Sequence, residues 1–356
     1  MAYSHNSVAV VAGGSAGVGR AVVTALLDRG LRVAVLARGQ QRLDDIARRY
    51  RDRVWTRSVD VSDGAAVDAA GDAIVEEFGR PEIWVNSAML TSYSPFEKMG
   101  EEEFRRITDT TYHGTVNGCR TALRIMRRGN LVNVGSGLAY ASVPFQSAYC
   151  GAKHAVEGFT QALRIELRRD GRPLHLSMVQ LPAVNTPQFD WARNRMHRHP
   201  QPVPPIFQPE VAAAAVLRAI DTDAREVLMG GTVLKLMAGN AILPDVVEWQ
   251  LARMGAEAQQ AEFPDDDMRD NLVTPVEDYP AVAHGSFDDQ ARGGGLIVDG
   301  DTARKAAALG GAALLLLAGA ALGRLAARNG PGDRTRRLAP GRARDGGDPL
   351  RVRRPY

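Results

Sequence analysis

Through roughly residue 232, the chain alternates short apolar runs rich in β-branched residues with longer amphipathic stretches. Runs of four to eight such residues are typical of buried strands, and apolar residues every three to four positions are typical of helices. The strands predicted in this way are Val8–Ala12, Arg32–Leu36, Val54–Val59, Ile83–Asn86, Leu131–Val134, Leu174–Leu181 and Glu226–Met229. The predicted helices between them include Arg20–Arg29, Gln41–Tyr50, Ala65–Phe78, Glu101–Arg128 and Ala148–Arg169.

The order of these elements predicts the fold class. Strands that alternate with helices form βαβ units, and right-handed crossovers place helices on both faces of a parallel sheet. We therefore predict an α/β fold with a doubly wound parallel sheet (a Rossmann fold), as a single catalytic domain over residues 1–235. Within it, the loop 182–205 carries Phe189, Trp191, Met196 and several prolines. A mobile apolar loop of this kind is typical of a lid over a substrate site.

Beyond this domain the pattern changes three times. Residues 236–305 have weak periodicity and predict a partly irregular C-terminal extension. Residues 306–323 form an uncharged run of eighteen residues, at the lower edge of the ~17–25 that a membrane-spanning helix needs. Residues 324–356 are rich in Arg, Gly and Pro, which predicts a disordered tail.

The hydrophobic run 306–323 predicts a terminal helix that contacts a membrane. If this helix crossed the membrane once, with the preceding domain in the cytoplasm, the Arg-rich tail would lie on the far side of the membrane. That arrangement opposes the positive-inside tendency. A helix that lies on the membrane would leave those arginines beside anionic headgroups. A helix docked on protein is a further alternative, because alanine and glycine make the run only moderately hydrophobic.

The charge distribution excludes a nucleic-acid-binding function. The chain has a net charge of +3, but residues 324–356 carry +7 and the rest carries −4. The basic charge therefore belongs to one terminal appendage. The two cysteines, Cys119 and Cys150, make no disulfide framework, and the N-terminus shows no secretory signal. We expect a cytoplasmic catalytic domain that is membrane-associated through the C-terminal segment.

A glycine-rich turn follows the first predicted strand, with Gly13, Gly17 and Gly19 in the spacing G-x-x-x-G-x-G. Such glycines allow a tight turn, an approach of the backbone to a pyrophosphate and close packing of helix on strand. The next helix then offers its N-terminal amides to the phosphates. The turn therefore predicts a dinucleotide site, and a loop that serves only backbone geometry is the alternative.

The second chemical motif is Tyr149 with Lys153 on the predicted helix Ala148–Arg169. Residues four apart share one helix face. Free tyrosine has a pKa of about 10, and a neighbouring ammonium lowers it, which prepares the phenol for acid–base work. This spacing occurs by chance in many helices. However, Ser136 stands thirteen residues earlier, at the end of a predicted strand. Strand, serine and helix together predict a site for carbonyl reduction.

Over about residues 7–232 these motifs resemble the short-chain dehydrogenase/reductase family, whose first turn reads TGxxxGxG; Ala12 stands where that family has Thr. The resemblance implies an oxidoreductase that interconverts a carbonyl and an alcohol, with Tyr149 as general acid/base. Ser136 would bind the substrate carbonyl, and Lys153 the nicotinamide ribose. Thr111 replaces the Asn that holds a water chain to the lysine in the family, so the proton relay is altered.

The second strand indicates the cofactor. Ala37 stands where an NAD-type enzyme has an acidic residue, and Arg38 follows it. A guanidinium suits a 2′-phosphate, so NADP(H) is favoured over NAD(H); the alternative is a solvated charge at a strand end. By resemblance, the cofactor is bound, besides Arg38, by Gly13, Ser15, Ala16, Gly17, Val18, Gly19, Asp60, Val61, Asn86, Ala88, Tyr149, Lys153, Pro182, Val184 and Thr186.

Two other functions stay open at this point. Thr111, Met89 and Ala183 depart from the family pattern and favour a catalytically weak NADP(H)-binding regulatory or scaffold protein. A sugar-nucleotide epimerase is the weaker alternative. The expected partner is a small-molecule carbonyl or alcohol. The apolar lid and the membrane helix together favour a hydrophobic substrate. The family resemblance favours a homo-oligomer. His197 and His199 lack a third ligand at metal spacing, so no metal site is predicted.

Overall fold

An eight-stranded sheet forms the centre of the computed structural model, which describes residues 3, 6–265 and 270–306. Its strand order is β14-β11-β7-β6-β4-β1-β2-β3, and all neighbours are parallel except β14 with β11. The strands are β1 (Val8–Ala12), β2 (Arg32–Ala37), β3 (Val54–Ser58), β4 (Pro81–Asn86), β6 (Gly129–Val134), β7 (Leu174–Gln180), β11 (Glu226–Met229) and β14 (Ile297–Asp299). Every predicted strand is present, and β14 comes from the extension.

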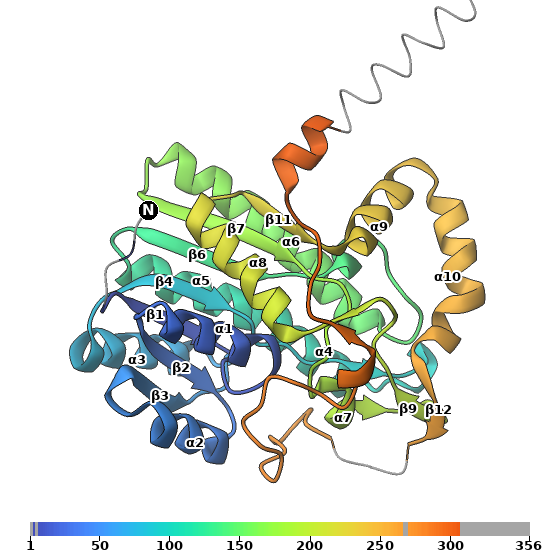
Figure 1. The fold of residues 1–356 in the computed structure, drawn as a ribbon, viewed down its shortest axis with the longest axis horizontal. Coiled ribbons are helices and arrows are strands. Elements are labelled where there is room, and N and C mark those ends of the chain that lie inside the picture. Colours follow the sequence, from blue (N-terminus) through green and yellow to red (C-terminus); the bar gives the residue numbers. More distant parts are fainter. Residues whose placement is uncertain (1–2, 4–5, 266–269, 307–356) are drawn as a thin grey trace, which may run out of the picture. The chain divides into compact units, whose positions relative to one another are not determined.

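Both faces of the sheet are buried, as the near-continuous apolar strands predict. In β1, Ala9 and Val11 belong to one core, and Val8 and Val10 belong to the other. The first core is covered by α1 (Gly17–Asp28), α2 (Gln40–Tyr50) and α8 (Pro209–Thr222). The second is covered by α3 (Gly64–Ala73), α5 (Gly114–Ile125) and α6 (Ser147–Arg169) (Figure 1). The Rossmann-like prediction is therefore confirmed.

Two predicted helices are not continuous α-helices. The segment predicted as one helix over Glu101–Arg128 is helical from Glu101 to Ile125, but α4 (Glu101–Thr108) passes into a π-helical turn, η4 (Asp109–His113), before α5 begins. Likewise α3 ends in a second π-helical turn, η2 (Ile74–Phe78). Such turns interrupt the apolar periodicity only slightly, so sequence spacing does not reveal them.

The C-terminal extension, expected to be partly irregular, contains two helices, α9 (Gly230–Ile242) and α10 (Pro244–Ala258), with Pro at the first position of α10. Short strand pairs join distant segments. These are β5 (Ser92–Tyr93) with β8 (Arg193–Asn194), β9 (Arg198–Pro200) with β12 (Gln260–Pro264), and β10 (Ile206–Phe207) with β13 (Ala291–Arg292). The remaining elements are α7 (Gln188–Trp191) and the 3-10 turns Arg51–Arg53, Phe96–Lys98, Gly137–Ala139 and Asp288–Gln290.

Met1–Arg304 form one compact unit. The predicted hydrophobic helix 306–323, apart from its first residue, and the tail 324–356 lie outside the described residues. Within the part of the chain that the structure does describe, no helix is both long enough and apolar enough to cross a bilayer. Contact with a membrane therefore stays a prediction from the sequence.

Candidate active site

A single cavity of about 770 Å³ brings the predicted site residues together. It lies at the carboxyl ends of the parallel strands, where ligands of open α/β sheets bind. The predicted residues that line it are Gly13, Ser15, Ala16, Gly17, Val18, Gly19, Arg38, Asp60, Val61, Ala88, Ser136, Tyr149, Lys153, Pro182, Val184 and Thr186. Of the residues predicted from the sequence, Asn86 and Thr111 do not line it.

Two glycines of the turn between β1 and α1 stand where a side chain would clash with the backbone. Gly13 and Gly17 have positive φ angles of 87° and 55°. A Cβ on Gly13 would lie 2.5 Å from the backbone nitrogen of Ala88, and one on Gly19 would lie 2.0 Å from the carbonyl oxygen of Gly13. The turn therefore exposes backbone at the start of α1, and it fits the pyrophosphate of a dinucleotide.

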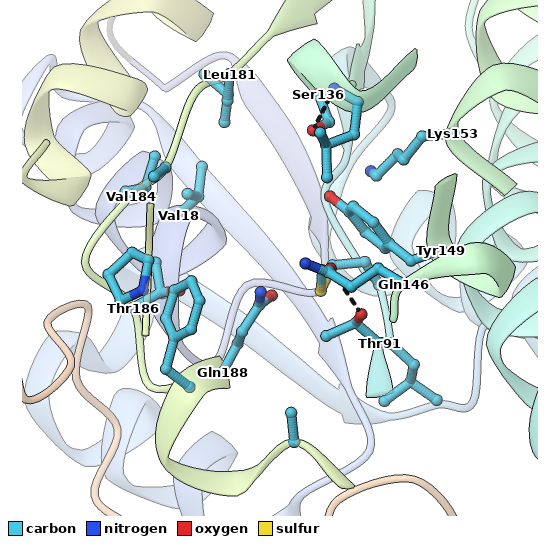
Figure 2. Close-up of a pocket in the computed structure, with 18 of the residues that line it drawn as sticks. Val18, Thr91, Ser136, Gln146, Tyr149, Lys153, Leu181, Val184, Thr186 and Gln188 are labelled. Atoms are coloured by element: carbon cyan, nitrogen blue, oxygen red, sulfur yellow. Dashed lines mark hydrogen bonds between the residues drawn. The ribbon is translucent and has the colours of Figure 1, made fainter. Parts of the chain in front are cut away.

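Three polar side chains meet at the other end of the cavity. Tyr149 and Lys153 lie one turn apart on α6, with the Lys153 Nζ 5.6 Å from the centre of the Tyr149 ring. The Tyr149 phenol lies near Ser136, which follows β6 and lowers the pKa of the phenol against the effect of burial. Figure 2 shows these groups facing Val184 and Thr186 across the cavity. The predicted Ser–Tyr–Lys set is therefore assembled.

Burial controls the ionisation of the two α6 side chains. It raises the pKa of the Tyr149 phenol, so the net shift is opposite to the lowering predicted from the sequence. Burial also lowers the pKa of Lys153 to about 8. The Lys153 Nζ donates a hydrogen bond of 2.8 Å to the carbonyl oxygen of Val134. Because desolvation disfavours both charged forms, Tyr149 keeps its proton at neutral pH, as reduction of a carbonyl requires.

Thr111 and Asn86 form hydrogen bonds with residues next to the cavity. The Thr111 Oγ1 accepts a hydrogen bond of 3.0 Å from the Leu90 nitrogen and donates one of 3.1 Å to the Leu90 oxygen. The Asn86 Nδ2 donates to the Asn133 Oδ1 at 2.9 Å, which joins β4 to β6. The proposed roles of Thr111 in proton transfer and of Asn86 in cofactor binding stay predictions.

The adenosine end of the cavity carries charged groups. Burial raises the pKa of Asp60, but hydrogen bonds from Arg106 and Ser62 outweigh it, so the pKa lies below its usual range. Arg38 is half-buried, and its guanidinium meets the C-terminal extension. The alternative of a solvated charge at the strand end is therefore wrong.

Sequence reasoning missed the part of the cavity wall that comes from beyond residue 230. Val247, Leu251 and Met254 of α10 line the cavity together with Leu236 of α9. Their spacing of three and four residues is a helical signal that was present in the sequence. Asn271 and Pro275 also line it, and they lie in a segment without any regular pattern.

The predicted lid 182–205 is fastened to the extension through His199. Its Nδ1 lies 3.0 Å from the Asp265 Oδ1, and its Nε2 lies 3.8 Å from the Asp190 Oδ1. These two carboxylates, Asp190 most of all, raise the pKa of His199. Tyr279 donates a hydrogen bond of 2.9 Å to Asp190, which adds a second tie between lid and extension.

The His199 contacts predict that stability depends on pH. Because the folded-state pKa is raised, protonated His199 stabilises the fold fully below about pH 6.5, the ordinary value, and this contribution is lost as the pH rises through the raised pKa. The melting temperature of the wild type should therefore fall more steeply above pH 6.5 than that of His199→Gln. Exposed His197→Gln is the control, measured by thermal unfolding at several pH values. Parallel curves for wild type and His199→Gln would contradict the assignment.

A glycine turn and a Ser–Tyr–Lys set on the carboxyl edge of a parallel sheet define the class of nicotinamide-dependent oxidoreductases. A family model described as short chain dehydrogenase matches residues 7–196, which is more than half of the chain. The protein belongs to the short-chain dehydrogenase family, and it is an oxidoreductase of that family, whose members use NAD(H) or NADP(H).

Several known proteins are similar to this chain. An uncharacterised oxidoreductase of Bacillus subtilis, YxnA, is 26% identical over 268 residues, which is 73% of this chain and 75% of the relative. The 2-(R)-hydroxypropyl-CoM dehydrogenase of Xanthobacter autotrophicus is 31% identical over 218 residues, 58% of this chain and 86% of that protein.

Solved structures share the fold. A short-chain dehydrogenase from Streptomyces avermitilis superposes with a TM-score of 0.60 at 28% identity, over 70% of this chain and 99% of the other. The actinorhodin polyketide ketoreductase, solved with NADPH, gives a TM-score of 0.55 at 25% identity, over 62% of this chain and 92% of the other.

Proposed function

We propose that this protein is an NADP(H)-dependent oxidoreductase that interconverts a carbonyl and an alcohol on a hydrophobic small molecule. The observation that carries the proposal is the cavity itself. It joins the glycine turn to buried Ser136, Tyr149 and Lys153 in one continuous space. The cavity is large enough for a ligand, and it reaches from the glycine turn to the proposed proton donor, Tyr149.

The bound nicotinamide cofactor would supply or accept the hydride. Tyr149 then gives its proton to the carbonyl oxygen, and Ser136, near the phenol, holds that oxygen in place. Lys153 lies 5.6 Å from the Tyr149 ring, where its positive charge stabilises the phenolate that remains. By family resemblance Lys153 also binds the ribose, and Thr186, on the opposite wall, the carboxamide.

The preference for NADP(H) rests on the end of β2. Arg38 lines the cavity there, and Ala37 supplies no carboxylate to bind a ribose 2′-hydroxyl. The buried Arg42 adds a second guanidinium in the next turn, and its Nε has no hydrogen-bond partner among the described residues. Two guanidinium groups suit a 2′-phosphate. The similar ketoreductase solved with NADPH supports the same choice.

A hydrophobic substrate fits the wall around Tyr149. Leu138, Val143, Phe189, Leu236 and Met254 line this part of the cavity. Gln146 is one of the few polar groups there, and its amide is already bonded to Gln259 at 2.6 Å. A long apolar chain would bury its surface against these residues. The proposal also includes three predictions that rest on the sequence alone. These are membrane contact through 306–323, a homo-oligomeric state and a cytoplasmic location.

The test is consumption of NADPH by the full chain, with aldehydes and ketones of rising chain length. We expect kcat/KM to rise roughly fourfold for each added methylene until the cavity is filled, as burial of about 0.8 kcal/mol per methylene implies. A preference for small polar carbonyls would sink the hydrophobic substrate. Tight NADPH binding without turnover on any substrate would favour the regulatory alternative, for which the engagement of Thr111 with Leu90 is the supporting observation.

A further inference from the structure

A segment of the extension, residues 271–283, lies along the adenosine end of the cavity; we call it the strap. In Figure 1 it is the orange segment that runs between α2 and α7. Asn271 donates a backbone hydrogen bond of 3.0 Å to the Trp191 oxygen of α7, and the strap also bonds to α1 and α2. The strap therefore contacts the elements that would hold the cofactor.

The first contact is with Arg38, the residue assigned to the 2′-phosphate. The Arg38 NH2 donates to the carbonyl oxygen of Asn271 at 2.5 Å. Its NH1 donates to the carbonyl oxygens of Leu272 and Val273 at 3.2 and 3.1 Å. The terminal nitrogens that would grip a phosphate are thus already bonded to neutral carbonyl groups of the strap.

The second contact places an acidic side chain at the first turn of α2, two residues beyond Arg38 in the sequence. The two carboxylate oxygens of Glu277 accept hydrogen bonds from the backbone nitrogens of Gln40 and Gln41, at 2.9 and 3.2 Å. These amides form the first turn of α2, where the helix dipole favours an anion. Arg42 of the same turn donates to the carbonyl oxygen of Val276. Glu277 thus holds the place that a phosphate group would take at this helix.

The third contact is at the pyrophosphate turn. The Gly17 nitrogen donates a hydrogen bond of 3.1 Å to the carbonyl oxygen of Val282, and the Arg20 Nε donates one of 3.3 Å to the carbonyl oxygen of Ala281. Both donors belong to the first turn of α1. Along its length, the strap therefore uses acceptor groups to occupy donors at the cofactor end of the cavity.

We infer that Glu277 and the strap compete with a 2′-phosphate for Arg38 and the first turn of α2, and so determine how this enzyme selects its cofactor. This inference rests on the proposed function. A 2′-phosphate and the Glu277 carboxylate are both anions, and their repulsion at close range opposes joint occupancy. A ribose 2′-hydroxyl carries no charge and meets no such repulsion. NADP(H) therefore binds tightly only when Glu277 leaves the α2 turn, whereas NAD(H) needs the strap to yield only at the pyrophosphate turn.

The test measures dissociation constants of NADPH and NADH by cofactor fluorescence for the wild-type chain and Glu277→Gln. The substitution keeps the shape of the side chain and removes its charge. We expect NADPH to bind about tenfold more tightly to Glu277→Gln, a change of about 1.4 kcal/mol, and NADH to change less than about twofold. Glu262→Gln removes the same charge from an exposed position in the extension and should leave both constants unchanged.

A second measurement follows the strap directly in the wild-type chain. Hydrogen exchange of the amides of residues 271–277, the part of the strap at Arg38 and α2, should speed up when 2′,5′-ADP is added, and should not change with 5′-ADP. Slower exchange with 2′,5′-ADP, or an unchanged ratio of NADPH to NADH affinity in Glu277→Gln, would overturn the competition. Failure of every variant to bind either dinucleotide would instead overturn the proposed function on which the inference rests.

Discussion

Replacing Tyr149 by Phe should lower kcat by about 10³-fold and leave the affinity for NADPH nearly unchanged. The hydroxyl is the proposed proton donor, and general acid–base catalysis contributes about 10²–10⁴-fold to a rate. The ring itself packs against buried Leu90, Ile107 and Leu272, and Phe keeps those contacts. The lost interaction with Ser136 should cost about 1 kcal/mol of stability at most. Turnover, NADPH binding and thermal unfolding are measured on the same preparation.

The matched control is Tyr112→Phe. The Tyr112 ring lies on η4 and packs edge-on against Phe159, with 6.3 Å between ring centres. It does not line the cavity, so its substitution should leave turnover within about twofold. If Tyr149→Phe kept more than a tenth of the wild-type kcat, another group would have to deliver the proton. The assignment of Tyr149 would then fail, whatever the outcome for the cofactor.

Replacing Gly19 by Ala should weaken dinucleotide binding by at least about tenfold. The added methyl group would lie 2.0 Å from the oxygen and 2.8 Å from the carbonyl carbon of Gly13. Both are backbone atoms, so the turn has to open, and such overpacking typically costs about 1–3 kcal/mol. An opened turn no longer presents its amides to the pyrophosphate. Titration with NADPH and thermal unfolding measure the two effects separately.

Gly158→Ala provides the comparison. Gly158 lies on the exposed side of α6, and nothing stands within 4 Å of a Cβ built there. Alanine in a helix is more stable than glycine by about 0.5–1 kcal/mol, so this variant should melt slightly higher and bind NADPH as the wild type does. Wild-type affinity in Gly19→Ala would show that close packing of the turn is dispensable for cofactor binding.

Local signals in the sequence were sufficient for the sheet and for the chemical motifs. Most strands of the parallel sheet are buried on both faces, so they stand out as apolar runs whose ends can be read within a few residues, whereas the edge strand β3 is partly exposed. Tyr149 and Lys153 are four apart on one helix, which guarantees a shared face wherever the helix packs. Gly19 is required by a backbone contact with Gly13 in its own turn, whereas Gly13 is required by the backbone of Ala88, which only the fold brings near.

Long-range packing decided the features that the sequence did not reveal. The π-helical turn η4 between α4 and α5 contains Thr111, which bonds to Leu90, twenty-one positions away. The pKa of Tyr149 depends on how deeply the fold buries it, and burial raises it. No spacing rule encodes either effect, because both depend on which elements pack together.

The contrast is sharpest at Arg38. By itself the sequence determined that a guanidinium follows β2, at the edge where a 2′-phosphate would bind. Only the tertiary structure decided that carbonyl oxygens some 233–235 positions further along meet that guanidinium, and that Glu277 joins the first turn of α2. Hydrogen bonds of this kind leave no periodic signal. They depend on the path of an irregular segment, and that path is set by the packing of the whole domain.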